Sequence, residues 1–325
     1  MSIALGFFAL AVSFMLFGQF ALTRARWTYR APRLAIALWQ ALAGAVVLSL
    51  LLGSMSLAHP GFSPVGTVGE IIHACFVELR EQYSTSTGAA ISGLGFGLFL
   101  VLSWRLASAL TRHHRRASRL RIQHLRRLAL VESDVGRDVA MVDHDAAAVY
   151  CIPPGRRSRD GRIIVTRGAN NLLTDHQLGL VLRHERAHLT ARHERPVKRS
   201  QALAEAFPLL PFFAVAHKEV ASLVEMHADD AIAIEDRPAL ATALLRLATS
   251  PQPRVPSGLL AAAGGATLAR ARRLVRPQPR LGRATAGLIV AAIIGVVAAP
   301  AILTVYSGRA GGFIHTCCDH LNFLT

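Results

Sequence analysis

Residues 178–193 read LGLVLRHERAHLTARH, and this stretch organises the rest of the chain. It contains His184, Glu185 and His188 in the pattern H-E-x-x-H. Residues four apart lie on one face of a helix, so both histidines can point at one metal ion while Glu185 flanks it. Two histidines and an adjacent glutamate are typical of a zinc-dependent hydrolase, provided that a third protein ligand lies elsewhere.

The residues before the motif indicate where its helix starts. Thr174 and Gln177 have the spacing of a capping box, and Leu173 and Leu178 that of a hydrophobic staple. Pro196 prevents an easy continuation of the helix. With 14 histidines in 325 residues, a chance H-E-x-x-H remains an alternative, so the rest of the chain must supply a matching ligand.

The composition is that of a membrane protein, with 52% hydrophobic and 17% charged residues. Four stretches are long and apolar enough to span a bilayer, which takes about 20 residues. These stretches are 3–22, 34–58, 88–110 and 284–306. The first has no basic region before its apolar run, so we expect a retained span rather than a cleaved signal peptide.

Arginines are distributed unevenly along the chain, whose formal charge is +16. They cluster in the first connection, after the third span and before the fourth, whereas the other flanks hold only Arg80 and Arg309. The positive-inside rule then places both termini outside and residues 111–283 in the cytoplasm. We expect three parts: spans in 1–110, a cytoplasmic domain in 111–283, and a last span with a short outer tail in 284–325. Topology and lipid headgroups explain the charge, so no nucleic acid partner is expected.

The third ligand is sought downstream, in residues 218–234, which read KEVASLVEMHADDAIAI. Glu225 and Asp229 share one helical face with small and apolar residues. An unpaired carboxylate on such a buried stripe is costly, and a metal held by the two histidines would supply a partner for Glu225. Asp229, one turn further on, is placed to accept a hydrogen bond from the free ring nitrogen of a ligand histidine.

Another position for the third ligand is ten residues after His184. Glu194 occupies it, His193 is one residue short, and the glycine of that extended zincin motif is missing. Glu225 is therefore preferred, and His193 and Glu194 are expected to be solvated at a fraying helix end. His227 is expected to be non-ligating because it is two residues from Glu225 and points elsewhere.

Two short strands are expected before the motif, over 146–152 and 162–166. The second can either pair with an extended substrate or be a plain core strand. Residues 205–216 are apolar but too short to span, and Pro208 and Pro211 interrupt them. No chemistry is expected in 235–283.

The two segments LRHERAHLTARH and EMHADDAIA resemble membrane-embedded gluzincin metallopeptidases. The closest resemblance is to the BlaR/MecR-type antirepressor peptidases, with the HtpX and CAAX prenyl protease families as broader relatives, and it covers roughly residues 145–235. It implies that His184, His188 and Glu225 hold one Zn²⁺ per chain. It further implies that Glu185 is the catalytic base and that Asp229 orients a ligand histidine. Because 19 residues follow Tyr306, no penicillin-binding domain is expected.

The expected fold is mainly α, with four transmembrane helices and a cytoplasmic α+β zincin-like catalytic domain. The expected function is a zinc metalloendopeptidase that cleaves a cytoplasmic regulatory protein, such as a transcriptional repressor. The alternatives are a non-catalytic membrane signalling or scaffold protein with a metal-stabilised domain, and an HtpX-like quality-control protease. His217 and Tyr150 are both open as oxyanion donors. Cys151 is expected to be a small buried residue, and Cys75 to pair with Cys317 or Cys318.

Overall fold

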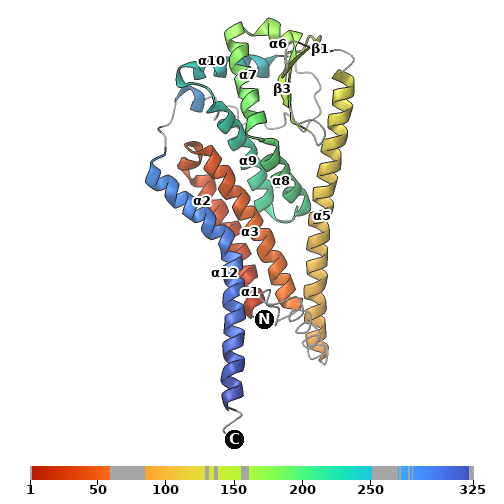
Figure 1. Ribbon diagram of the computed structural model, residues 1–325, viewed down its shortest axis with the longest axis vertical. Helices are drawn as coiled ribbons and strands as arrows, with labels where there is room; N and C mark the ends of the chain where they lie inside the picture. Colours follow the sequence, from red (N-terminus) through yellow and green to blue (C-terminus); the bar gives the residue numbers. More distant parts are fainter. Residues whose placement is uncertain are drawn as a thin grey trace. The chain divides into compact units, whose positions relative to one another are not determined.

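The computed structural model describes residues 2–58, 85–128, 132–134, 138–154, 161–250, 270, 272–276, 279 and 281–321. The chain forms two compact units, which are described separately (Figure 1). Unit 1 comprises Met1–Arg24, Ala37–Ser108 and Arg283–Thr325, and unit 2 comprises Ala25–Ile36 and Ala109–Gly282. The expected disulfide of Cys75 lies outside the described residues.

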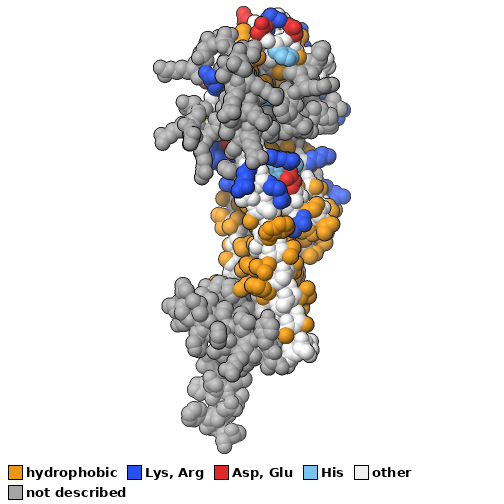
Figure 2. Space-filling model, turned by 90° about the vertical axis from the view of Figure 1, so that its right-hand side faces the viewer, with side chains coloured by type: hydrophobic (Ala, Val, Ile, Leu, Met, Phe, Trp, Pro, Cys, Tyr) orange, Lys and Arg blue, Asp and Glu red, His pale blue; other side chains and the backbone are white. Residues whose placement is uncertain are grey.

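Four helical segments are long and apolar enough to cross a membrane, which confirms the four predicted spans. They are Ile3–Arg24, Pro32–Ala58, Ser86–His113 and Arg283–Tyr306. The elements that carry them are α1 (Ser2–Ser13), η1 (Phe14–Gly18), α2 (Gln19–Arg24), α3 (Pro32–Ala58), α5 (Ser86–Leu128) and α12 (Arg283–Leu321), with η2 (Arg26–Tyr29) after the first. Their side chains are largely apolar, and apolar side chains gather on the face shown in Figure 2. The chain is therefore built to be a multi-pass membrane protein.

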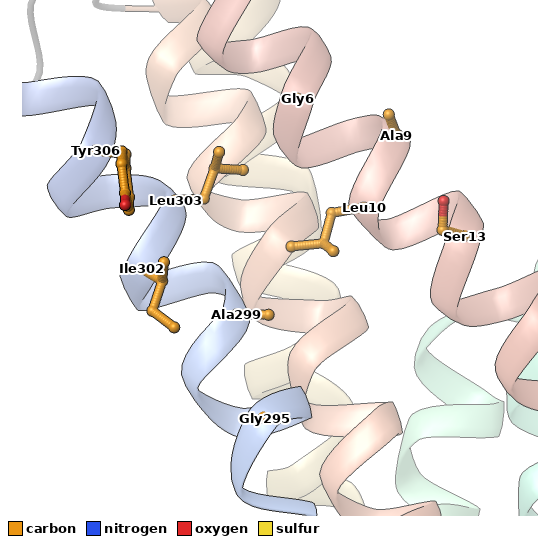
Figure 3. A pocket seen from close by; sticks show the side chains of 9 residues that line it. All are labelled: Gly6, Ala9, Leu10, Ser13, Gly295, Ala299, Ile302, Leu303 and Tyr306. Carbon is orange, nitrogen blue, oxygen red and sulfur yellow. The ribbon is translucent and has the colours of Figure 1, made fainter. Parts of the chain in front are cut away.

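Helices α1 and α12 pack together in unit 1 through small residues. A Cβ atom on Gly6 would lie 3.6 Å from the side chain of Leu303, so this position allows close approach of the two helices. An open groove of about 520 Å³ runs beside the contact (Figure 3). It is lined by Gly6, Ala9, Leu10, Ser13, Gly295, Ala299, Ile302, Leu303 and Tyr306. No charged side chain lines it, and its lining is mainly small and apolar.

Unit 2 is built on a four-stranded sheet with the order β1-β2-β4-β3. The strands are β1 (Glu132–Asp134), β2 (Val139–Val142), β3 (Val149–Ile152) and β4 (Arg162–Thr166). β4 pairs with β2 in parallel and with β3 antiparallel. The bounds predicted for the second strand are confirmed, but its suggested role in pairing with a substrate is wrong, because both of its edges are already occupied. Of the described strands, β3 and β1 are the edges.

The inner strand β4 leads into the short helix α6, which precedes the motif helix. Ile163, Ile164 and Val165 are almost fully buried, as expected for an apolar run covered on both faces. Thr166 caps α6 (Arg167–Leu172) by accepting a hydrogen bond from the backbone N–H of Ala169. Gly168 must be glycine, since a Cβ there would collide with the backbone of Asp145.

The predicted start of the motif helix is confirmed. α7 (Asp175–Thr190) begins with the full capping box: the hydroxyl of Thr174 accepts from the N–H of Gln177, and the side chain of Gln177 accepts from the N–H of Thr174. Leu178 packs against the cluster that contains buried Leu173, as a hydrophobic staple requires. α7 packs against β3, and α9 and α10 also contact it (Figure 1).

The helix ends earlier than Pro196 suggested. The chain turns at Arg192, which has a φ of 51°, and α8 (Glu194–Ala206) starts two residues later with Pro196 in its first turn. α9 (Pro211–Asp229) follows, so 205–216 is the end of one helix, a turn and the start of the next. η3 (Ile234–Asp236) and α10 (Arg237–Thr249) complete the described helices of unit 2. Ile232 lies beyond the end of α9 and is buried in the core.

Candidate metal centre

Three side chains from two helices converge at one point. His184 and His188 come from α7 and Glu225 from α9, and each offers one ligand atom within 4.8 Å of the others. The Nε2 atoms of the histidines are 3.1 Å apart, and they lie 3.6 and 3.7 Å from the carboxylate oxygens of Glu225. Tetrahedral zinc with bonds near 2.1 Å separates its ligands by about 3.4 Å. This donor set therefore fits a zinc ion in both chemistry and spacing.

The sequence predicted Asp229 beside one of the two motif histidines, and in the structure it contacts His184. Asp229 is fully buried, and its Oδ1 lies 3.1 Å from Nδ1 of His184. The ring N–H is not aligned with this oxygen, so the contact is an ion pair rather than a straight hydrogen bond. Burial alone would lower the pKa of His184, but Asp229 and Glu225 outweigh it and raise the pKa to about 9.

Glu185 projects from the same helix toward the edge strand β3. Its side chain shares a hydrogen bond with the thiol of Cys151, in the middle of that strand. Burial raises the pKa of Glu185, which strengthens this carboxylate as a proton acceptor. Burial, followed by the nearby charge of Glu185, also raises the pKa of the Cys151 thiol, which is free and partly buried. Cys151 is thus a neutral neighbour of Glu185.

Arg270 was not predicted, because no chemistry was expected in 235–283. Its Nε and Nη2 atoms donate to the two carboxylate oxygens of Asp229 at 2.7 and 2.8 Å. The same guanidinium lies 2.8 Å from Glu225 and 3.0 Å from Nε2 of His184. Burial opposes the charges of Glu225 and Asp229, yet His184 and Arg270 hold the pKa of each carboxyl below its usual range. The lone pair of His184 Nε2 can accept a hydrogen bond from Arg270 or bind a metal, but it cannot do both. Metal binding therefore requires Arg270 to release His184.

His193 was expected to be solvated, and this expectation is wrong. The residue is 4% exposed, and its Nδ1 atom lies 3.0 Å from Nδ1 of His188. Its Nε2 atom lies 2.7 Å from Nδ1 of His227. Burial is the main reason that the pKa of His193 falls to about 3 and that of His188 to about 4. All three rings are near one another, but only His188 belongs to the metal-ligand cluster.

The other sequence candidates lie elsewhere. Glu194 is outside the ligand cluster found among the described residues. His217 pairs with Ser200, with Nδ1 3.1 Å from the hydroxyl oxygen. Tyr150 packs against the cluster of Ala140, Ile152 and Ile164. Because side chains alternate along a strand, Tyr150 and Cys151 point to opposite faces of β3, so Tyr150 points away from Glu185.

Replacing Arg270 with Met is expected to destabilise the metal-free chain by about 3–5 kcal/mol, since Asp229 would keep a buried charge without its guanidinium partner. Chemical unfolding in detergent with a chelator present measures the loss. The double variant Asp229→Asn/Arg270→Met should lose less stability than Arg270→Met, because no buried charge is left unpaired. Arg272→Met, at an exposed position two residues away, is the matched control. Equal stabilities of Arg270→Met and Arg272→Met would contradict the expected role of this ion pair.

Comparison with known families supports a peptidase. Residues 114–251 match peptidase family M48, and this segment contains His184, Glu185, His188, Glu225 and Asp229. The match supports a zincin-type metallopeptidase domain and a protein or peptide as substrate. It does not single out the BlaR/MecR type. No curated protein and no solved structure matched the chain.

Proposed function

We propose that this protein is an integral-membrane zinc endopeptidase. The observation that carries the proposal is the convergence of His184, His188 and Glu225 from two helices, with Glu185 beside them. A purely structural metal site has no use for a partly buried carboxylate next to its ligands. That carboxylate favours catalysis over the scaffold alternative.

The roles of the residues follow from their positions. His184, His188 and Glu225 would hold one Zn²⁺. Asp229 would orient His184, and Arg270, once it has released His184, would balance the charge of Asp229. When bound, zinc supplies Lewis-acid activation of a water molecule and of the peptide carbonyl. Glu185 accepts the proton of that water and passes it to the leaving amine, which its raised pKa favours.

The substrate is proposed to bind beside β3 rather than β4. β3 pairs with β4 on one side, and among the described strands no other pairs with it. Cys151, in the middle of β3, faces Glu185. An extended peptide added to this edge would be held by backbone hydrogen bonds alongside the base. An extended or locally unfolded segment of a protein is therefore the substrate class.

We place the catalytic unit in the cytoplasm and both termini outside, because arginines cluster at the flanks of the spans on that side, whereas the other flanks hold only Arg80 and Arg309. A thiol reagent that cannot cross membranes should then leave Cys151 unlabelled in intact cells. It should label Cys151 after lysis and unfolding, which expose this partly buried, neutral thiol. Labelling of Cys151 before lysis would contradict this orientation. The orientation makes a cytoplasmic regulatory protein, such as a transcriptional repressor, the preferred target.

A second candidate function is quality control of membrane proteins. Leu209, in the turn between α8 and α9, is 92% exposed. This exposure favours contact with lipid or with an apolar substrate segment. Comparing the protein inventories of cells that carry the wild type or Glu185→Gln separates the two. Accumulation of one repressor supports regulation, and accumulation of many membrane proteins supports quality control. If no protein changes, proteolysis is not the function and the scaffold alternative holds.

A further inference from the structure

His188 makes contacts through both of its ring nitrogens. Nε2 faces the ligand cluster, 3.1 Å from Nε2 of His184 and 3.7 Å from Glu225. Nδ1 lies 3.0 Å from Nδ1 of His193, whose Nε2 in turn lies 2.7 Å from Nδ1 of His227. Both distances are those of hydrogen bonds, so three imidazoles form one continuous chain that starts at the proposed metal ligand.

The direction of every hydrogen bond in this chain follows from a single requirement. A neutral imidazole has one N–H and one lone pair, and a metal needs the lone pair of His188 Nε2. The proton of His188 must then be on Nδ1, which donates to Nδ1 of His193. His193 therefore carries its proton on Nε2 and donates it to Nδ1 of His227. The tautomers of all three rings are set by one another.

A turn of the backbone at Arg192 brings the three imidazoles into line. Arg192 adopts a φ of 51°, a left-handed conformation that costs a non-glycine residue about 1–2 kcal/mol. The turn folds the chain back, so that the N–H of His193 donates to the carbonyl of His188 at 3.1 Å. It also buries His193, which is 4% exposed. A strained turn is thus used to place His193 against His188.

The last imidazole of the three, His227, lies on the same helix as the third proposed ligand. His227 belongs to α9, two residues after Glu225, while His188 lies in the last turn of α7. The hydrogen bonds through His193 therefore connect the helix of two ligands with the helix of the third. His184 has a different partner, the carboxylate of Asp229. The Nδ1 atoms of the two proposed histidine ligands thus have different partners, Asp229 for His184 and His193 for His188.

We propose that His193 and His227 are positioning residues, which lock His188 as an Nε2 metal ligand through a chain of three imidazoles. The proposal rests on the metal binding of the proposed function, not on proteolysis. The role of His193 requires a hydrogen-bond acceptor at the position of its Nδ1 atom. A side chain of similar size without an acceptor would not hold the ring of His188.

The test compares two replacements of His193 in the full-length chain in detergent. Leu removes the acceptor, and Asn keeps an oxygen where Nδ1 was. Competition with a chelator measures the Zn²⁺ affinity, and the visible absorption of Co²⁺-loaded protein reports the ligand geometry. His193→Leu is expected to weaken Zn²⁺ binding by about 10–100-fold and to change the Co²⁺ spectrum. His193→Asn should retain most of the affinity and the wild-type spectrum. His176→Leu, an exposed position on α7, is the control.

A double variant tests whether the chain acts as a unit. His227 acts on His188 only through His193, so adding His227→Leu to His193→Leu should cause no further loss of affinity. Equal losses in the Leu and Asn variants, wild-type affinity in His193→Leu, or additive losses in the double variant would each overturn the proposal. If His193→Leu does not fold, His227→Leu and His227→Asn are compared instead. They remove and keep the acceptor for His193 Nε2. A wild type that binds zinc without cleaving peptides refutes the proposed function alone, and one that binds no zinc refutes both.

Discussion

Replacing Glu185 with Gln is expected to lower the rate of peptide cleavage by about 10²–10⁴-fold while the chain keeps its zinc. Gln has the shape of Glu but cannot accept the proton of the attacking water. Glu185 lies outside the cluster of His184, His188 and Glu225, so metal binding should not depend on it. The measurement is cleavage of an unfolded protein substrate by the purified full-length chain, together with its zinc content.

The matched control is Glu194→Gln. Glu194 is a partly buried glutamate at the start of α8, outside the ligand cluster, and its replacement should leave cleavage unchanged. A Glu185→Gln chain that cleaves at the wild-type rate would exclude Glu185 as the base. Loss of both zinc and cleavage would instead show that Glu185 helps to hold the metal.

The second large effect is expected at the third ligand. Glu225→Ala should abolish tight zinc binding and lower the stability of unit 2, because metal binding contributes to the folding free energy. Glu194→Ala should retain full zinc occupancy. The two residues are the alternatives that the sequence offers, and only Glu225 lies within 4.8 Å of both histidine ligand atoms.

Zinc content after dialysis, and the midpoint of thermal unfolding with and without zinc, measure this prediction. Wild type should be stabilised by added zinc, and Glu225→Ala should not. The opposite pattern, with zinc lost from Glu194→Ala and kept by Glu225→Ala, would reverse the assignment of the third ligand. His184→Ala provides the reference for complete loss.

Features of the fold that depend on near neighbours in the chain could be predicted from the sequence. Thr174 and Gln177 are three residues apart, so their capping box needs no other part of the molecule. The H-E-x-x-H spacing likewise depends only on the helical repeat. The four spans follow from long apolar runs, whose burial in lipid does not depend on which neighbour each one has. Glu225 was preferred as a ligand because it lies on an apolar helical face, and its carboxylate does lie beside His184 and His188.

Only the tertiary structure decided what lies against these local features. Arg270 could not be distinguished by sequence from the other arginines that precede the last span, and only its contacts with Asp229, Glu225 and His184 single it out. His193 looked like the end of a fraying helix, because a positive φ at Arg192 carries no signal in the residue type. The sequence left β4 as either a substrate-pairing strand or a plain core strand, and its pairing on both edges decides for the core strand. In each case the deciding contact joins residues distant in sequence or depends on one backbone angle, and neither leaves a periodic pattern in the chain.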